Sequence, residues 1–129
     1  MRAYVGVTAQ ELSEFLKSAT LDVSDVYAAT DFFVKANPDL DEEEIEYTLS
    51  IVAAEDAQDL VATGTGVPLV LAFEISEDII EAKHEMSVSL SAPLLWKNLE
   101  CCFEISDDGE ELTWFATQEI SEKITEWLA

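Results

Sequence analysis

The sequence predicts an α+β fold in which a mixed sheet of five or six strands packs against a long central helix and two terminal helices. Apolar residues recur at helical spacing over residues 41–62, which predicts the long helix. A nearly continuous apolar run at residues 67–75 indicates a strand buried on both faces. Apolar residues alternate with serines over residues 86–91, a pattern typical of a strand with one face in water.

The chain has 129 residues and a mass of 14.3 kDa, which fits one domain. Hydrophobic residues make up 49% of it, enough for a core that buries about two-thirds of the unfolded surface. We therefore predict a single domain spanning residues 1–129.

The start of the chain predicts a strand, a helix and a second strand. Residues 3–7 favour a strand, and Thr8 with Glu11 forms a capping box for a helix over Ala9–Ser18. Residues 25–29 favour the second strand. Strand, helix and strand at this spacing predict a parallel pair joined by a right-handed crossover.

The end of the chain predicts a hairpin and a terminal helix. Residues 101–105 alternate in polarity, residues 107–109 carry a turn signal, and residues 112–116 are the expected partner strand. Thr117 is expected to cap the last helix. The inner stripe of that helix consists of Ile120, Ile124 and Trp127.

The aromatic residues near the end of the chain are expected to serve mainly as anchors of the core. Trp96, Trp114 and Trp127 are the three tryptophans. Trp114 and Phe115 are neighbours on a predicted strand, so they point to opposite faces. One of these two side chains is therefore expected to be partly exposed or covered by a helix.

The charge balance is strongly acidic, with six Lys and Arg residues against 28 Asp and Glu residues, for a net charge of −22. This argues against direct binding to nucleic acid or to an anionic membrane, because both are negative themselves. The densest acidic run forms a candidate acidic interaction face, made of Asp39, Asp41, Glu42, Glu43, Glu44 and Glu46. These acids also complement the dipole of the predicted long helix. The run lacks the glycine that a calcium loop needs at its sharp turn.

The sequence holds no motif of a known catalytic centre. Glycine-rich phosphate loops, dinucleotide fingerprints and nucleophile elbows are all missing. His84 is the single histidine, which excludes a zinc site built on paired histidines, and we expect it on the surface at a strand start. Cys101 and Cys102 are adjacent, so a bridge between them would be strained and reduced thiols are expected. We predict no catalytic residue, metal or cofactor, and favour a non-enzymatic protein.

The chain gives no signal for a membrane or for export. Its longest apolar run, residues 67–73, is far shorter than the roughly 20 residues of a membrane helix. Residues 1–7 carry one arginine and a short apolar run, unlike a signal peptide. With the expected reduced thiols, this predicts a cytoplasmic protein.

The two ends of the chain, MRAYVGVTAQEL and LTWFATQEI, resemble an uncharacterised family of acidic actinobacterial proteins, a domain of unknown function. Its members open on Met-Arg, a hydrophobic strand and a Thr-initiated helix, and close on a Trp-aromatic-Ala-Thr-Gln-Glu segment, here residues 114–119. The middle helix, DEEEIEYTLSIVAAEDA, is also similar in pattern, and the chain is shorter than members between Asp108 and Leu112. The resemblance implies a cytoplasmic bacterial protein that is acidic by habit, with no known activity, substrate or cofactor.

The positions shared with that family define a candidate polar cluster, which consists of Arg2, Thr117, Gln118 and Glu119. The alternative interpretation is local. The last three of these residues occupy the first turn of the terminal helix, where such side chains satisfy free backbone N–H groups.

Three hypotheses for function follow. The leading one is a non-enzymatic protein that presents an acidic surface to a basic protein partner, with DNA mimicry as its sharpest version. The second is a domain or enzyme that binds a small ligand or divalent metal through carboxylates in a pocket. The third is a structural subunit of a homo-oligomer.

Overall fold

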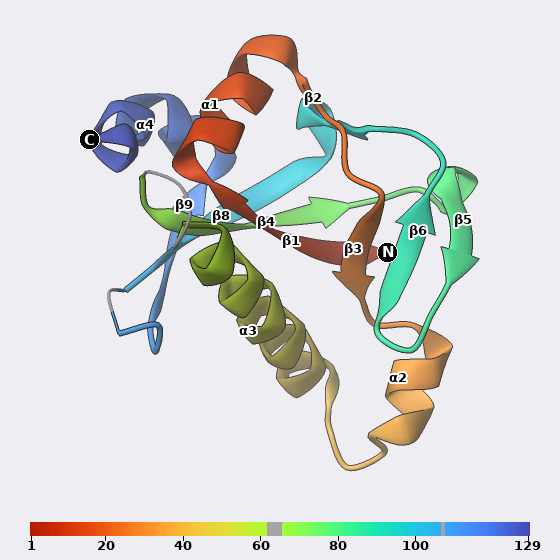
Figure 1. Ribbon diagram of the computed structural model, residues 1–129. Coiled ribbons are helices and arrows are strands. Elements are labelled where there is room, and N and C mark those ends of the chain that lie inside the picture. Colours follow the sequence, from red (N-terminus) through yellow and green to blue (C-terminus); the bar gives the residue numbers. More distant parts are fainter. Residues whose placement is uncertain (62–65, 107) are drawn as a thin grey trace.

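The computed structural model describes residues 1–61, 66–106 and 108–129, and confirms an α+β fold (Figure 1). The strands are β1 (Arg2–Thr8), β2 (Thr20–Leu21), β3 (Asp25–Ala28), β4 (Pro68–Glu74), β5 (Ile80–Lys83), β6 (Ser87–Leu90), β7 (Leu94–Leu95), β8 (Leu99–Ile105) and β9 (Leu112–Ala116). The helices are α1 (Ala9–Ser18), α2 (Asp31–Ala36), α3 (Glu42–Val61) and α4 (Ile120–Leu128), with short 3₁₀ turns at Glu77–Ile79, Trp96–Asn98 and Thr117–Glu119. None of the helices within these ranges combines the length and hydrophobicity needed to cross a bilayer.

The main sheet has seven strands in the order β5-β6-β3-β1-β4-β8-β9, rather than the five or six expected. Each pair of neighbouring strands in it is antiparallel, so the predicted mixed sheet is wrong. The predicted parallel pair of the first two strands is wrong for a specific reason. After α1, Ala19 adopts a left-handed conformation (φ 65°), and the chain pairs β2 with β7 in a separate small sheet. It then enters β3 antiparallel to β1, with Ala3 opposite Ala28.

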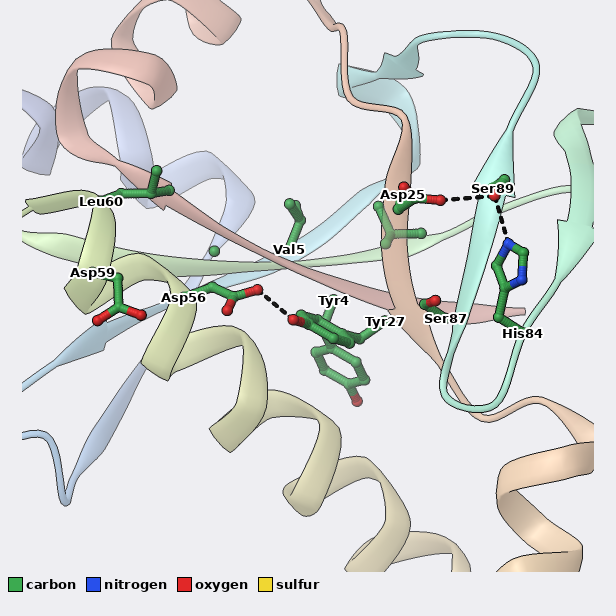
Figure 2. A pocket seen from close by; sticks show the side chains of 12 residues that line it. Tyr4, Val5, Asp25, Tyr27, Asp56, Asp59, Leu60, His84, Ser87 and Ser89 are labelled. Carbon is green, nitrogen blue, oxygen red and sulfur yellow. Dashed lines mark hydrogen bonds between the residues drawn. The ribbon is translucent and has the colours of Figure 1, made fainter.

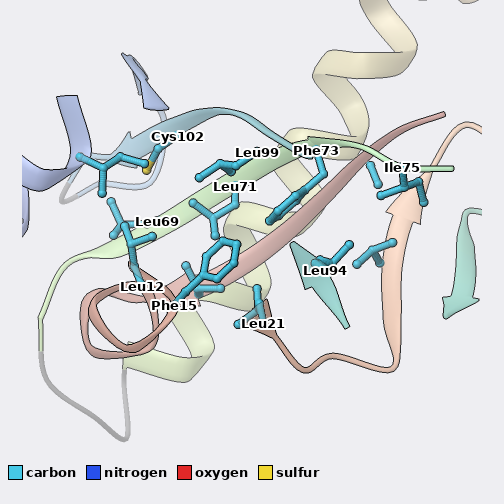
Figure 3. Close-up of a cluster of buried hydrophobic side chains, with 14 of the residues drawn as sticks. Leu12, Phe15, Leu21, Leu69, Leu71, Phe73, Ile75, Leu94, Leu99 and Cys102 are labelled. Atoms are coloured by element: carbon cyan, nitrogen blue, oxygen red, sulfur yellow. The ribbon is translucent and has the colours of Figure 1, made fainter. Parts of the chain in front are cut away.

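Strand β4 lies inside the sheet and is buried on both faces, as the sequence predicts. Leu69, Leu71 and Phe73 point to the face covered by α1 and α4, where they pack with Phe15 and Trp127 (Figures 1 and 3). The alternate side chains point to the opposite face, which α3 covers, and pack there in a second cluster. Strand β4 therefore contributes side chains to two hydrophobic cores, one on each face of the sheet.

Helix α3 lies very close to β1, and Gly6 makes this approach possible. A Cβ atom at Gly6 would lie 2.3 Å from the carbonyl oxygen of Ala53 and 2.8 Å from the backbone nitrogen of Ala57. No side chain fits there, so the glycine and the two alanines set the height of α3 above the sheet. The helix packs mainly against β1, β4 and β3, in the middle of the sheet.

The ends of the predicted helices mostly agree with the structure. The long helix was expected over residues 41–62. Asp41 instead caps it, since its Oδ1 accepts from the N–H of Glu44 at 2.8 Å and the Glu44 carboxylate accepts from the N–H of Asp41 at 3.2 Å. Residue 62 lies outside the described residues.

The C-terminal hairpin and helix pack as the sequence predicts, but the predicted capping residue of the helix is wrong. Strands β8 and β9 form the predicted hairpin, although residue 107 of its turn lies outside the described residues. Ile120, Ile124 and Trp127 form the buried stripe of α4, as predicted. Thr117 was expected to cap this helix. It lies instead in a 3₁₀ turn, and its hydroxyl donates to the carbonyl of Leu99 at 2.9 Å.

Candidate functional site

An open groove of about 630 Å³ lies beside the second half of α3 (Figure 2). Strands β1, β3 and β6 form its floor, because α3 packs mainly against β1, β4 and β3. Asp56 and Asp59 on α3 form one wall, and Asp25 and His84 line the other side. Its charged walls suit a cationic ligand or side chain better than an anion.

A chain of hydrogen bonds crosses the β3–β6 side of this groove (Figure 2). The hydroxyl of Ser89 donates to Oδ1 of Asp25 at 2.7 Å, and Nε2 of His84 lies 2.7 Å from the same hydroxyl oxygen. The hydroxyl has one proton, which it gives to Asp25, so its contact with His84 is a hydrogen bond in the tautomer that carries a proton on Nε2. The order is carboxylate, serine, imidazole. In a serine hydrolase the imidazole stands between the carboxylate and the serine, so the order of the three groups here differs from that of a catalytic triad.

The tyrosine on the floor connects the sheet to the helix. The hydroxyl of Tyr27 on β3 donates to Oδ2 of Asp56 on α3. Burial, the hydrogen bond to Asp56 and the negative charges of Asp56 and Glu55 raise the pKa of Tyr27 to about 12. Tyr27 therefore stays protonated at neutral pH and holds one of the groove carboxylates in place.

The candidate acidic interaction face lies around the start of α3. Asp39, Asp41, Glu42, Glu43 and Glu44 are exposed, and Glu46 is half-buried. Successive helical residues point about 100° apart, so these carboxylates surround the end of the helix rather than sharing one side of it. Two of them, Asp41 and Glu44, also form the helix cap.

The structure does not bring the candidate polar cluster together. Across residues 1–61, 66–106 and 108–129, no hydrogen bond or ion pair joins Arg2 to Thr117, Gln118 or Glu119. In the sheet, β4 and β8 separate β1 from β9 and the turn that follows it. The carboxylate of Glu119 accepts from the N–H of Ala116 at 2.9 Å, while Gln118 is exposed.

Arg2 instead meets a residue of the acidic face. Arg2 and Glu46 line the same two adjoining hollows beside the first half of α3. The guanidinium Nη2 lies 3.6 Å from the Sγ of Cys101, and its carbon lies 6.0 Å from the ring centre of Tyr4. Arg2 thus contributes the one basic side chain of these hollows.

The cysteines have no reactive setting. Cys101 and Cys102 are free and buried, and because they are neighbours on β8 their side chains enter opposite cores. Burial raises the pKa of both thiols, which keeps them protonated. No three His, Cys, Asp or Glu side chains in the described part of the chain are grouped so that they could hold a metal ion.

Sequence reasoning missed most of this groove. The alternation over residues 86–91 predicted that Ser87 and Ser89 share a wet face, which the structure confirms. Asp25, Tyr27 and Asp56 carried no local signal, since their proximity depends on how α3 crosses the sheet. His84 is exposed as expected, although it follows the end of β5 rather than starting a strand.

Together these features define a class: an acidic α+β domain with a seven-stranded antiparallel sheet and an open, carboxylate-lined groove beside its long helix. A family model matches residues 1–108, and the chain belongs to this family of unknown function (DUF6912). The closing motif at residues 114–119 lies beyond the matched residues. No curated protein and no solved structure shows a significant match to the chain.

Proposed function

We propose that this protein is a non-enzymatic interaction protein that binds a basic protein partner through its acidic surface. The observation that carries the proposal is the composition of α3, which has no lysine or arginine along its length. Its seven acidic residues are Glu42, Glu43, Glu44, Glu46, Glu55, Asp56 and Asp59. All of them except Glu46 are exposed.

Few cations lie near these charges: Arg2, which shares two hollows with Glu46, is the basic side chain lining the hollows beside the first half of α3. The ion pairs found in the described ranges join the amino terminus to Glu74 at 2.8 Å, Lys83 to Glu77 at 3.2 Å and Lys123 to Glu126 at 2.5 Å. None of them involves α3. A largely uncompensated field of this kind attracts a basic partner and weakens with salt.

The arrangement favours a basic protein segment over the narrower hypothesis of DNA mimicry. The acids of α3 fall into two groups, at Glu42–Glu46 in the first turns and at residues 55–59 near the end. Residues 47–54 between them carry no charge, and at about 1.5 Å per residue they span about 12 Å. Duplex DNA carries a charge about every 1.7 Å along its axis, so α3 alone does not reproduce such a row.

The proposal is tested by capture from a host lysate at about 50 and about 500 mM NaCl, followed by identification of the bound proteins. We expect a basic protein that is retained at low salt and released at high salt. Its retention should fall at least about tenfold for a variant with Glu42→Gln, Glu43→Gln and Glu44→Gln, which removes three charges from the start of α3.

A matched control separates this surface from net charge alone. Glu14→Gln, Asp22→Asn and Glu122→Gln remove the same number of charges from exposed positions outside α3. We expect this control to retain the partner nearly as well as the wild type. Equal losses in both variants would contradict a contact at α3, and no salt-released basic protein at all would contradict the proposed function.

A second candidate function rests on the groove. Its volume and its three aspartates would accommodate a small organic cation, held by Asp25, Asp56 and Asp59 over the ring of Tyr27. Spermidine is a suitable probe, with MgCl₂ of equal ionic strength as the control. A rise in melting temperature with spermidine that disappears in Asp56→Asn, Asp59→Asn would support this function, and equal responses to both salts would contradict it.

A further inference from the structure

The two edges of the main sheet differ in how they are protected. Strand β5 carries Glu81 and Lys83 and has a register shift between Ile80 and Ala82. Charges and bulges are the devices by which natural edge strands avoid pairing with other chains. Strand β9 ends the other side of the sheet with the sequence LTWFA, which has no charge, no proline and no glycine.

The hydrogen-bond pattern leaves polar backbone groups at the outer edge of β9. The N–H of Ser106 donates to the carbonyl of Glu111 at 2.9 Å, so this is a hydrogen-bonded pair. In an antiparallel ladder such pairs alternate, and the register places Leu112, Trp114 and Ala116 in the pairs that point away from β8. The carboxylate of Glu119 accepts from Ala116. Within the described residues, no element follows β9 in the sheet to occupy Leu112 and Trp114.

A partly exposed apolar surface lies next to this edge. We call it the apolar shelf, and it consists of the exposed Tyr47 and Trp114 and the half-buried Phe103 and Leu112. Trp114 stands opposite Phe103 on the α3 side of the sheet, and its side chain is 57% exposed. Tyr47 on α3 is 60% exposed and shares a hollow with Phe103 and Leu112. Exposed aromatic side chains beside a free strand edge are typical of a docking surface.

Carboxylates surround the shelf and define the chemistry of its occupant. Glu43 and Glu46 line the same hollow on the helix side, and Glu110 and Glu111 are exposed immediately before β9. Arg2 is the one cation there. A second copy of this chain would bring a net charge of −22 against these acids, so charge complementarity favours a basic segment.

We propose that β9 accepts an extended, basic segment of a partner protein as an additional strand of the sheet. The backbone of the segment bonds to the outward groups of Leu112 and Trp114. Its apolar side chains cover the shelf on the α3 face of the sheet. Lysines or arginines on the same face of the segment lie near Glu43, Glu46 and the acids before β9. This inference rests on the proposed function, because it names the form and the docking edge of the basic partner.

The test uses a fluorescein-labelled peptide, Lys-Thr-Val-Thr-Val-Thr-Lys, in which the lysines and valines share one face of an extended strand. The control peptide has glycine in place of each valine, with the same charge. We expect the valine peptide to bind at least about tenfold more tightly, and to protect the amides of Leu112 and Trp114, but not those of β5, from hydrogen exchange.

Two protein variants with the same change in charge locate the contact. Trp114→Lys gives β9 a protecting charge and should weaken binding of the valine peptide at least about tenfold. Ala82→Lys places the same charge on β5, at an exposed position, and should change the affinity less than about twofold. Far-UV circular dichroism of both variants verifies that the fold is retained.

Three other results would contradict the inference, and each has a different meaning. Equal, salt-sensitive binding of both peptides, unchanged by Trp114→Lys, would contradict strand addition and leave the proposed function standing. Absence of binding by either peptide at about 50 mM salt would contradict both. Self-association of the protein alone, abolished by Trp114→Lys, would assign the edge to a second copy instead.

Discussion

The two ends of the seven-stranded sheet lie on either side of α3 and differ in nearly every property that governs association. At the β5 end the edge strand is charged and bulged, and the adjoining floor is polar, with Ser89 bonded to Asp25 and to His84. At the β9 end the edge strand is uncharged and the floor is apolar, with Trp114 exposed beside Phe103.

Net charge alone therefore does not describe how this surface can associate with a partner. At the β5 end, the charges and the bulge of the edge strand oppose pairing with another chain, and carboxylates line the adjoining groove. The other end combines an unprotected edge with apolar side chains, inside an acidic rim. A basic partner is therefore attracted by the whole surface, but only the β9 end offers backbone pairing and an apolar contact.

The largest expected effect concerns the helix that separates the two ends. Gly6→Val places a side chain against the backbone of Ala53 and Ala57, which cannot move aside without displacing α3. We expect a loss of about 3 kcal/mol in the free energy of unfolding, measured by urea denaturation. Ser87→Ala, on the same face but at the polar end, should cost less than about 0.5 kcal/mol. A tolerated Gly6→Val would contradict the close packing of α3 on β1.

A smaller effect tests the link between α3 and the polar end. Tyr27→Phe removes the hydrogen bond to Asp56 and should cost about 1 kcal/mol at neutral pH. Tyr47→Phe is the matched control, because Tyr47 lies on the other side of α3 and is exposed. It should change stability by less than about 0.5 kcal/mol.

The same tyrosine gives a pH dependence with a definite sign. Its pKa is about 12 in the folded protein and 10.0 without the fold, so the folded state holds the proton more tightly. The stability from Tyr27 is therefore complete below pH 10 and lost as the pH rises toward 12. Because burial also raises the pKa of Tyr4, absorbance titration of the phenols should show two late-titrating groups, one of which disappears in Tyr27→Phe. Loss of a phenol that titrates near its ordinary pKa of 10.0 would instead contradict the Tyr27–Asp56 contact.

The smallest effect tests the uncompensated charge itself. Because like charges oppose compaction, the melting temperature should rise by a few degrees as NaCl is added from low ionic strength. The variant with Glu42→Gln, Glu43→Gln and Glu44→Gln should show a smaller rise. A flat or falling response in the wild type would show that the carboxylates are already compensated.

The sequence predicted those elements that local signals define. The Thr8–Glu11 capping box fixed the start of α1, and helical and strand periodicity located α3, β4 and the final hairpin. The orientation of β3 escaped prediction because it depends on the excursion through β2 and its pairing with β7, which no local pattern encodes.

In the candidate site too, features with a local signal were predicted and those that depend on distant contacts were not. The acidic start of α3 was visible as a run of carboxylates, and the serines of β6 as a wet face. The pairing of Tyr27 with Asp56 required α3 to cross the sheet at the height that Gly6 permits. Arg2 and residues 117–119 were grouped because both ends of the chain resemble the same family. The sheet keeps these residues apart.

The most direct test of the central claim is the salt dependence of binding to the lysine–valine peptide. Its affinity should be measured between about 50 and about 500 mM NaCl for the wild type and for the variant with Glu42→Gln, Glu43→Gln and Glu44→Gln. We predict a steep fall in affinity with salt for the wild type and a clearly smaller slope for the variant. Identical slopes, or an affinity independent of salt, would contradict an acidic surface on α3 as the attraction for a basic partner.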